Sequence, residues 1–218
     1  MALERYGAKR VKALHFEYAQ RNSPETQCAR HLAETLGVEL VVVDVSAAFA
    51  AVLCSSTGTA GTLMGGAERD EEDGGEVGGE HEVIKGTPAT FVPGRNLIFL
   101  HLAAALALSR QVTEVWIGVH HGSLYPDCTR EALRAVEGSV REGMGFEGFE
   151  VVSPLMDEAP IAVFNLARFY GVWELAVEHT HSCYSSNSKQ HEWGRGCGVC
   201  VPCMFRRWAV STAPTPTG

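Results

Sequence analysis

The alternation of hydrophobic and polar positions in the first 45 residues predicts a strand, a helix and a second strand. Residues 11–18 have the mixed pattern of a strand, and residues 38–45 form a nearly continuous β-branched run, typical of a strand covered on both faces. The helix between them has Pro24 at its first position and Gly37 just past its end. Such alternation implies that the two strands pair in parallel.

The rest of the chain continues this alternation, so the predicted fold class is α/β with a parallel sheet. Residues 1–7 match the last turns of a helix closed by a glycine. Further on we expect helix, strand, helix, strand and helix, in that order, over residues 96–109, 112–119, 129–142, 149–153 and 160–170. The longest apolar run, at 97–108, is too short to cross a bilayer, so no membrane partner is expected.

The net charge of −8 is concentrated in one segment. Residues 68–82 hold eight Asp and Glu side chains against one Arg, which leaves the remainder of the chain nearly neutral. A broad basic surface is therefore excluded, and no nucleic-acid partner is expected. Residues 55–86 have almost nothing to bury, and we interpret them as an acidic disordered insertion, with a partner-binding segment as the alternative. Residues 211–218 are expected to be a disordered tail, and residues 1–210 a single domain.

Four cysteines near the end of the chain have the spacing of a metal site. They follow a C-x13-C-x2-C-x2-C pattern at Cys183, Cys197, Cys200 and Cys203. A short turn places two thiolates on one side of an ion, and Gly196 and Gly198 allow the backbone angles that this turn needs. We interpret residues 183–203 as a closed, structural zinc site in a C-terminal helical region. An iron–sulfur cluster, free thiols and disulfides are the alternatives, although an odd cysteine total and the lack of a secretory signal argue against disulfides and favour a reducing, cytoplasmic location.

Four segments in collinear order resemble one protein family. They are Leu-His-Phe-Glu-Tyr-Ala-Gln-Arg at 14–21, Phe-Val-Pro-Gly-Arg-Asn at 91–96, Gly-Val at 118–119 with Tyr-Pro-Asp-Cys at 125–128, and Ser-Cys-Tyr at 182–184 with the later cysteines. Together they resemble the 7-cyano-7-deazaguanine synthase (QueC) family over residues 3–207. The resemblance implies the adenine-nucleotide α-hydrolase fold of ATP pyrophosphatases. It also implies ATP-dependent conversion of 7-carboxy-7-deazaguanine and ammonia to the nitrile, in the biosynthesis of queuosine and related deazaguanines.

Two residues in these segments are candidates for catalysis. Arg95 is suited to hold a carboxylate or phosphate through two parallel hydrogen bonds, although it could equally pair with a structural carboxylate. Asp127 offers two acceptor oxygens to the N–H face of a guanine-like ring, or else it simply begins the next helix.

Three further residues are candidates for substrate binding. Asn96 either caps its helix or faces a ligand, and Tyr125 either stacks on a heterocycle or simply packs against neighbouring side chains. His120 follows the end of a predicted strand, where open α/β sheets bind ligands. The resemblance also assigns ATP binding to His15, Phe16 and Arg21.

The sequence departs from the family at its front. The family begins with a strand and a phosphate-binding Ser-Gly-Gly-x-Asp-Ser loop, and nothing similar precedes residues 1–7. We therefore expect an N-terminally incomplete fold that lacks a central strand, and a chain that is inactive alone, because ATP with Mg²⁺ needs that loop. A non-catalytic, zinc-stapled paralogue that binds a deazapurine or a partner subunit is the alternative. A relative acting on RNA or on another carboxylate is a third reading, and a homodimer is left open.

Overall fold

The computed structural model describes residues 1–18, 24–50, 85, 87, 91–120, 125–159, 161–184 and 186–213. The predicted acidic insertion at 55–86 lies outside the described residues except for Lys85, and Arg21 and residues 214–218 also lie outside them. The chain divides into two compact units, one made of Met1–Val77 with Phe164–Gly218 and the other of Gly78–Val163. Each unit is described by itself, and the assignment of residues 1–210 to one domain stays a prediction.

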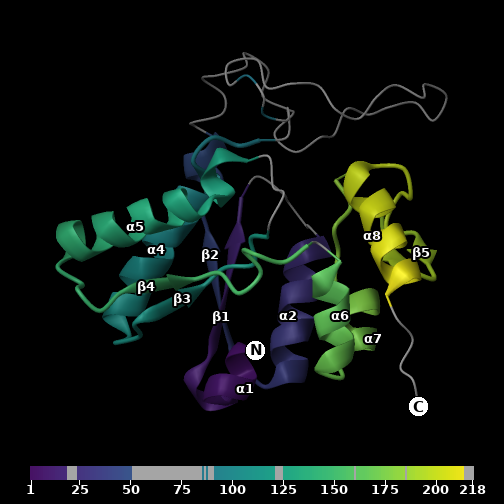
Figure 1. The fold of residues 1–218 in the computed structure, drawn as a ribbon, viewed down its shortest axis with the longest axis horizontal. Helices are drawn as coiled ribbons and strands as arrows, with labels where there is room; N and C mark the ends of the chain where they lie inside the picture. The colour runs from purple at the N-terminus through teal and green to yellow at the C-terminus, as the bar shows by residue number, and fades with distance from the viewer. Residues whose placement is uncertain are drawn as a thin grey trace. The chain divides into compact units, whose positions relative to one another are not determined.

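The first unit opens with the predicted strand–helix–strand motif. A short helix, α1 (Ala2–Tyr6), and a 3-10 turn, η1 (Ala8–Arg10), precede β1 (Lys12–Glu17), α2 (Pro24–Leu36) and β2 (Glu39–Asp44). β1 and β2 pair in parallel from Lys12 opposite Glu39 to Glu17 opposite Asp44, and α2 packs on both strands (Figure 1). Gly7 and Gly37 close their helices at φ 75° and 66°, which confirms the predicted glycine stops.

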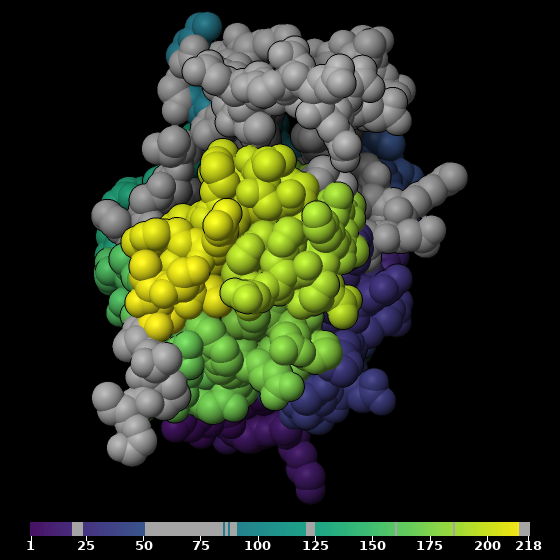
Figure 2. All heavy atoms as spheres, turned by 90° about the vertical axis from the view of Figure 1, so that its right-hand side faces the viewer, coloured from purple at the N-terminus to yellow at the C-terminus, as the bar shows by residue number. Residues whose placement is uncertain are grey.

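The first unit also contains the C-terminal segment. It comprises α6 (Ala162–Phe169, in this unit from Phe164), α7 (Trp173–Glu178), a small antiparallel hairpin of β5 (Gln190–His191) and β6 (Gly194–Arg195), and α8 (Val201–Thr212). Figure 2 shows the hairpin and α8, in yellow-green to yellow, beside the green helices α6 and α7. The hairpin has no hydrophobic run of its own, so the sequence pattern did not predict it. α8 includes Ser211 and Thr212, two residues that the sequence assigned to the tail.

The second unit contains another strand–helix–strand motif. It runs through α4 (Arg95–Ser109), β3 (Glu114–Trp116), the 3-10 turn η2 (Pro126–Cys128), α5 (Arg130–Met144) and β4 (Glu150–Val152). β3 and β4 pair in parallel, with α4 and α5 packed against them (Figure 1). Apolar side chains spaced along α4 and α5 form the core with residues beside β3 and β4: Leu100, Ala104, Val119, Leu133, Val136, Val140, Phe149 and Val151. β3 is shorter than the predicted strand at 112–119.

The α/β class with parallel strands is confirmed. Among the described residues, the parallel strands form two separate pairs, one in each unit, and no ladder of hydrogen bonds joins the pairs. No helix in the described part of the chain is long and apolar enough to cross a membrane.

Candidate functional site

The four predicted cysteines converge on one point in the C-terminal segment. Their sulfur atoms all lie within 4.8 Å of one another. Cys183 comes from the chain after α7, Cys197 and Cys200 from the turn after the hairpin, and Cys203 from the first turn of α8. Three of the four side chains are buried, and Cys197 is partly buried. The sequence spacing therefore predicted the cluster correctly.

The distances between sulfur atoms fit a tetrahedral ion. Cys197 Sγ lies 3.9 Å from Cys203 Sγ, and Cys200 Sγ lies 3.9 Å from Cys183 Sγ. An ion with metal–sulfur bonds of about 2.3 Å requires sulfurs about 3.8 Å apart. A disulfide would require about 2 Å, so these cysteines are free thiols, and the donor set is that of a closed four-sulfur metal site.

Backbone amides point at the sulfur atoms, as expected for a site that holds thiolates. The amide of Cys197 donates to Cys183 Sγ at 3.3 Å, and the amides of Val199 and Cys200 donate to Cys197 Sγ at 3.5 and 3.3 Å. Burial raises the pKa of the Cys197 thiol, but the amides of Val199 and Cys200, together with the thiols of Cys200 and Cys183, outweigh it and bring the pKa down to about 6. Gly198, at φ 81°, allows the turn that presents them.

A buried arginine, Arg206, connects the segments around the cluster, and the sequence analysis did not identify it. Arg206 is 4% exposed and lies on the face of α8 that also buries Cys203 and Ala209. Its guanidinium donates to the carbonyls of Trp193, Ala176 and Val177, and to the hydroxyls of Thr180 and Ser182. The helical spacing of Cys203, Arg206 and Ala209 is the signal that would have identified it as an inward-facing arginine.

A second group of predicted residues meets at the first turn of α4. The helix begins at Arg95 after Gly94, whose φ of 73° places it in the left-handed region, and Gly94 offers no side-chain cap. Asp127, 5% exposed, accepts a hydrogen bond at Oδ2 from the backbone amide of Asn96 at 3.1 Å. A carboxylate at the positive end of a helix is favourable, so Asp127 supplies the missing cap from η2.

The sequence left two roles open for Asn96, a helix cap or a ligand contact, and this arrangement rules out the helix cap. Asn96 is the second residue of α4, and its side-chain amide donates to Cys128 Sγ at 3.2 Å instead. Two hydrogen bonds, Asn96 N to Asp127 Oδ2 and Asn96 Nδ2 to Cys128 Sγ, therefore join the segments at 91–96 and 125–128. These two family segments are 31 residues apart at that contact, and the structure brings them into one place.

Tyr125 and Phe91 form an aromatic wall next to this turn. Their ring centroids are 5.6 Å apart and the planes are inclined by 19°, so one face of Tyr125 stacks on Phe91. Phe91 is buried, whereas Tyr125, Arg95 and His120 are partly buried. The structure thus brings Arg95, Asn96, Tyr125 and Asp127 together in the second unit, and His120 lies in the same unit beyond β3.

The residues assigned to ATP lie in the first unit. His15 and Phe16 are on β1, and His15 Nε2 is 3.0 Å from the hydroxyl of Thr26 on α2. Burial lowers the pKa of His15, and the charge of Glu17 only partly opposes this. Arg21 lies outside the described residues, so the role of this group stays a prediction.

A cluster of four thiols and an α/β body with parallel strands define an α/β protein with a candidate metal site. The sequence matches the family described as "Queuosine biosynthesis protein QueC" over residues 1–213. The chain belongs to this family.

Curated relatives cover almost the whole chain. It is 35% identical to 7-cyano-7-deazaguanine synthase 1 of Rhodopseudomonas palustris, over 100% of this chain and 89% of the relative. It is 34% identical to 7-cyano-7-deazaguanine synthase of Chromobacterium violaceum, over 99% and 83% of the two chains. A relative of the same name from Caulobacter vibrioides is 35% identical over 94% and 83%.

Proposed function

We propose that this chain belongs to an enzyme that converts 7-carboxy-7-deazaguanine and ammonia to 7-cyano-7-deazaguanine with ATP. Family membership supports the reaction, and one structural observation supports the site. Two family segments far apart in sequence meet where Asp127 accepts from the amide of Asn96. Arg95 directly precedes Asn96, and Tyr125 comes two residues before Asp127, which supports a shared site for the guanidinium and the aromatic ring within one unit.

The chemistry requires a group that binds a carboxylate. Conversion of a carboxylate to a nitrile removes two oxygen atoms, and each must first become a good leaving group by attacking the α-phosphate of one ATP, which releases pyrophosphate. Ammonia displaces the first as AMP to give the amide, and the amide then loses the second as AMP together with two protons. Arg95 is suited to hold the substrate carboxylate through two parallel hydrogen bonds, and Tyr125 is suited to stack on the deazaguanine ring.

Asp127 has a divided role in this proposal. Its Oδ2 fixes the first turn of α4, and its Oδ1 receives only a long contact from Cys128 Sγ at 3.7 Å. Oδ1 is therefore the atom suited to accept from an N–H group of the deazaguanine ring. His120, beyond the end of β3, is proposed to carry a proton during the ammonia step. His15, Phe16 and Arg21 are proposed to contact ATP with Mg²⁺.

Zinc is the proposed ion in the cysteine cluster. Four thiolates at tetrahedral spacing leave no open position, so the ion supplies folding energy and no catalysis. Free thiols of this kind remain reduced in the cytoplasm, where we place the protein.

The nucleotide site is proposed to need a phosphate loop. The 218 residues contain no Ser-Gly-Gly-x-Asp-Ser sequence, and loop amides of that kind stabilise charge on transferring phosphates. We therefore propose that a polypeptide of these 218 residues binds the deazapurine but does not turn it over. A non-catalytic paralogue is the alternative. A polypeptide extended by a phosphate-loop segment distinguishes the two, because the paralogue would still form no nitrile.

Calorimetric titration of the purified chain tests the substrate site. We expect 7-carboxy-7-deazaguanine to bind at one site, and Arg95→Gln to weaken that binding about 10- to 100-fold, because a charge-assisted pair is lost. Binding of 7-deazaguanine, which has no carboxylate, should change little in the same variant. Arg110→Gln, at the other end of α4, is the matched control. Equal losses in the two variants, or no binding by the parent chain, would contradict the proposal.

A further inference from the structure

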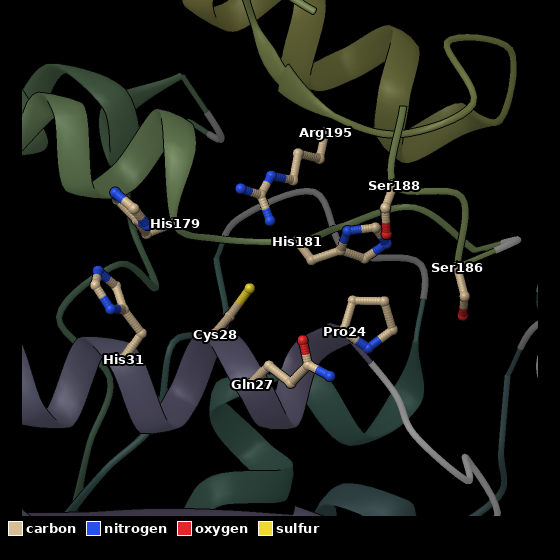
Figure 3. A pocket seen from close by; sticks show the side chains of 9 residues that line it. All are labelled: Pro24, Gln27, Cys28, His31, His179, His181, Ser186, Ser188 and Arg195. Carbon is tan, nitrogen blue, oxygen red and sulfur yellow. The ribbon is translucent and has the colours of Figure 1, made fainter. Parts of the chain in front are cut away.

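A polar cavity in the first unit is not part of the sites described above. It has a volume of about 450 Å³, within the range of small-molecule sites, and far more than the roughly 30 Å³ share of one water. α2 forms its floor, and the chain after α7 and strand β6 form the other walls (Figure 3). Its lining residues all belong to the first unit: Pro24, Gln27, Cys28, His31, His179, His181, Ser186, Ser188 and Arg195.

Among the described residues, the lining is rich in hydrogen-bond donors and contains no carboxylate. One guanidinium, three imidazoles, two hydroxyls and one amide face the cavity, and neither Asp nor Glu is among the lining residues. Figure 3 shows the guanidinium of Arg195 and the thiol of Cys28 pointing toward one another across it. Arg195 Nε donates to Gln190 Oε1 at 3.1 Å, which fixes the side chain while its two terminal nitrogens lie toward the cavity.

His181 is the unusual member of this lining. Both of its ring nitrogens are buried, and neither has a hydrogen-bond partner among the described residues. A buried imidazole without a partner is unfavourable by about 1–3 kcal/mol, so such groups are normally satisfied by a ligand or by water. Because neither nitrogen is accessible to a molecule the size of water, His181 shapes this wall, and an anion in the cavity depends on the other donors.

The charge of Arg195 acts within the cavity. Burial raises the pKa of the Cys28 thiol, and the charge of Arg195 is the largest influence in the opposite direction, followed by that of Arg206. Arg206 already donates five hydrogen bonds to carbonyls and hydroxyls. It therefore contributes its charge to the cavity, but it has no free N–H group to donate to a ligand. The cavity therefore combines positive potential with unused donors.

We propose that this cavity binds a small oxyanion, of the phosphate or carboxylate class, at Arg195. Arg195 supplies the forked pair of donors that such anions accept. Ser186 and Ser188 line the same cavity with hydroxyls able to complete the shell. A metal ion is the less suitable ligand, because within the described residues only the four clustered cysteines hold three or more ligand atoms close enough to share one.

Titration of the zinc-loaded chain with inorganic phosphate, and separately with acetate at the same ionic strength, tests the proposal. We expect one saturable site for at least one of the two anions, and the tighter of them names the class. Arg195→Gln should weaken that binding at least 10-fold. Arg207→Gln removes the same charge from an exposed position in the same unit and should leave binding unchanged. Absence of saturable binding, or equal weakening in both variants, would overturn the proposal.

Alkylation of the unmodified protein gives a second readout that needs no variant. Cys28 lines the cavity and Cys128 lies at the first turn of α4, so the two thiols report on different sites. Mapping by mass spectrometry should show that the bound anion slows iodoacetamide labelling of Cys28 and leaves Cys128 unaffected. Protection of Cys128 alone would place the anion at Arg95 and overturn the assignment. Neither result depends on turnover, so failure here is distinct from failure of the proposed enzyme activity.

Discussion

The Nε of Arg206 donates to the carbonyl oxygen of Trp193 at 3.0 Å, and this bond joins helix α8 to the β5–β6 hairpin. The terminal nitrogens of Arg206 donate to the carbonyls of Ala176 and Val177, so the same side chain also closes the C-terminal end of α7. A single guanidinium thus holds three elements around the cysteine cluster.

Replacement of Arg206 by lysine should strongly destabilise the zinc-loaded chain. One ammonium cannot reach five acceptors, and buried carbonyls that lose a charged donor become unsatisfied. We expect the free energy of unfolding, measured by urea denaturation, to fall by about 3 kcal/mol or more. Arg207→Lys, at the exposed neighbouring position, should change it by less than about 0.5 kcal/mol. Similar values for the two variants would show that the Arg206 network contributes little.

The packing of Gly196 against the cluster predicts a loss of metal when a methyl group is added. A Cβ at this position would overlap Cys203 Sγ and approach Cys183 Cβ to 3.4 Å. Gly196→Ala should therefore lower both zinc content and melting temperature. Gly143→Ala is the matched control, because a Cβ there meets nothing within 4 Å and the residue lies inside α5. It should retain zinc and gain about 0.4–1 kcal/mol of stability. Full zinc content in Gly196→Ala would be inconsistent with the cluster as described.

Elemental analysis tests the cluster itself. The purified chain should contain about one zinc, and Cys200→Ser should lose most of it, because a hydroxyl is a poor substitute for a buried thiolate. The C-terminal segment should then become the first part of the chain to unfold. Cys128→Ser removes a thiol outside the cluster and should keep the metal. Iron in place of zinc would point to a cluster of the iron–sulfur type.

The lowered pKa of His15 predicts a loss of stability in mild acid. Burial lowers this pKa below its ordinary value of 6.5, so between the two values the unfolded chain binds more protons than the folded chain. The contribution of His15 is therefore present above about pH 6.5 and is lost as the pH falls through 6.5 toward the folded value. Urea denaturation at about pH 7.5 and about pH 5.5 should show a steeper fall for the parent chain than for His15→Gln. If the free energy of unfolding falls equally in the parent chain and in His15→Gln, His15 has the same pKa in the folded and unfolded states.

Local signals in the sequence predicted much of the fold because they act over short distances. Pro24 and Gly37 mark the ends of α2, and the cysteine spacing identified the metal cluster. The role of Asp127 as a cap of α4 escaped prediction, because it lies 31 positions from Asn96, and the sequence offered Asn96 itself as either the cap or a ligand contact. The pairing of strands into separate units depends equally on contacts between distant segments, which no local pattern reports.

The inward-facing arginine and the polar cavity were missed for a related reason. Arg206 occupies a buried position of α8 that the pattern leaves for an apolar residue, and its five acceptors come from three other segments. Cys28, His181 and Arg195 are scattered along the sequence and meet only in the folded first unit. Charged and imidazole side chains of this kind are identified by what surrounds them, and the sequence does not show those surroundings.

Nitrile formation by two forms of the chain tests the central claim most directly. One is the polypeptide of these 218 residues, and the other carries an added strand–Ser-Gly-Gly-x-Asp-Ser–helix segment before Met1. Both are supplied with 7-carboxy-7-deazaguanine, ammonia, ATP and Mg²⁺, and the product is measured by mass spectrometry. The account predicts no nitrile from the first form, clear turnover by the second, and none from the second once Arg95→Ala is introduced. Turnover by the 218-residue form alone, or an extended form that folds, binds both substrates and yields no nitrile, would contradict it.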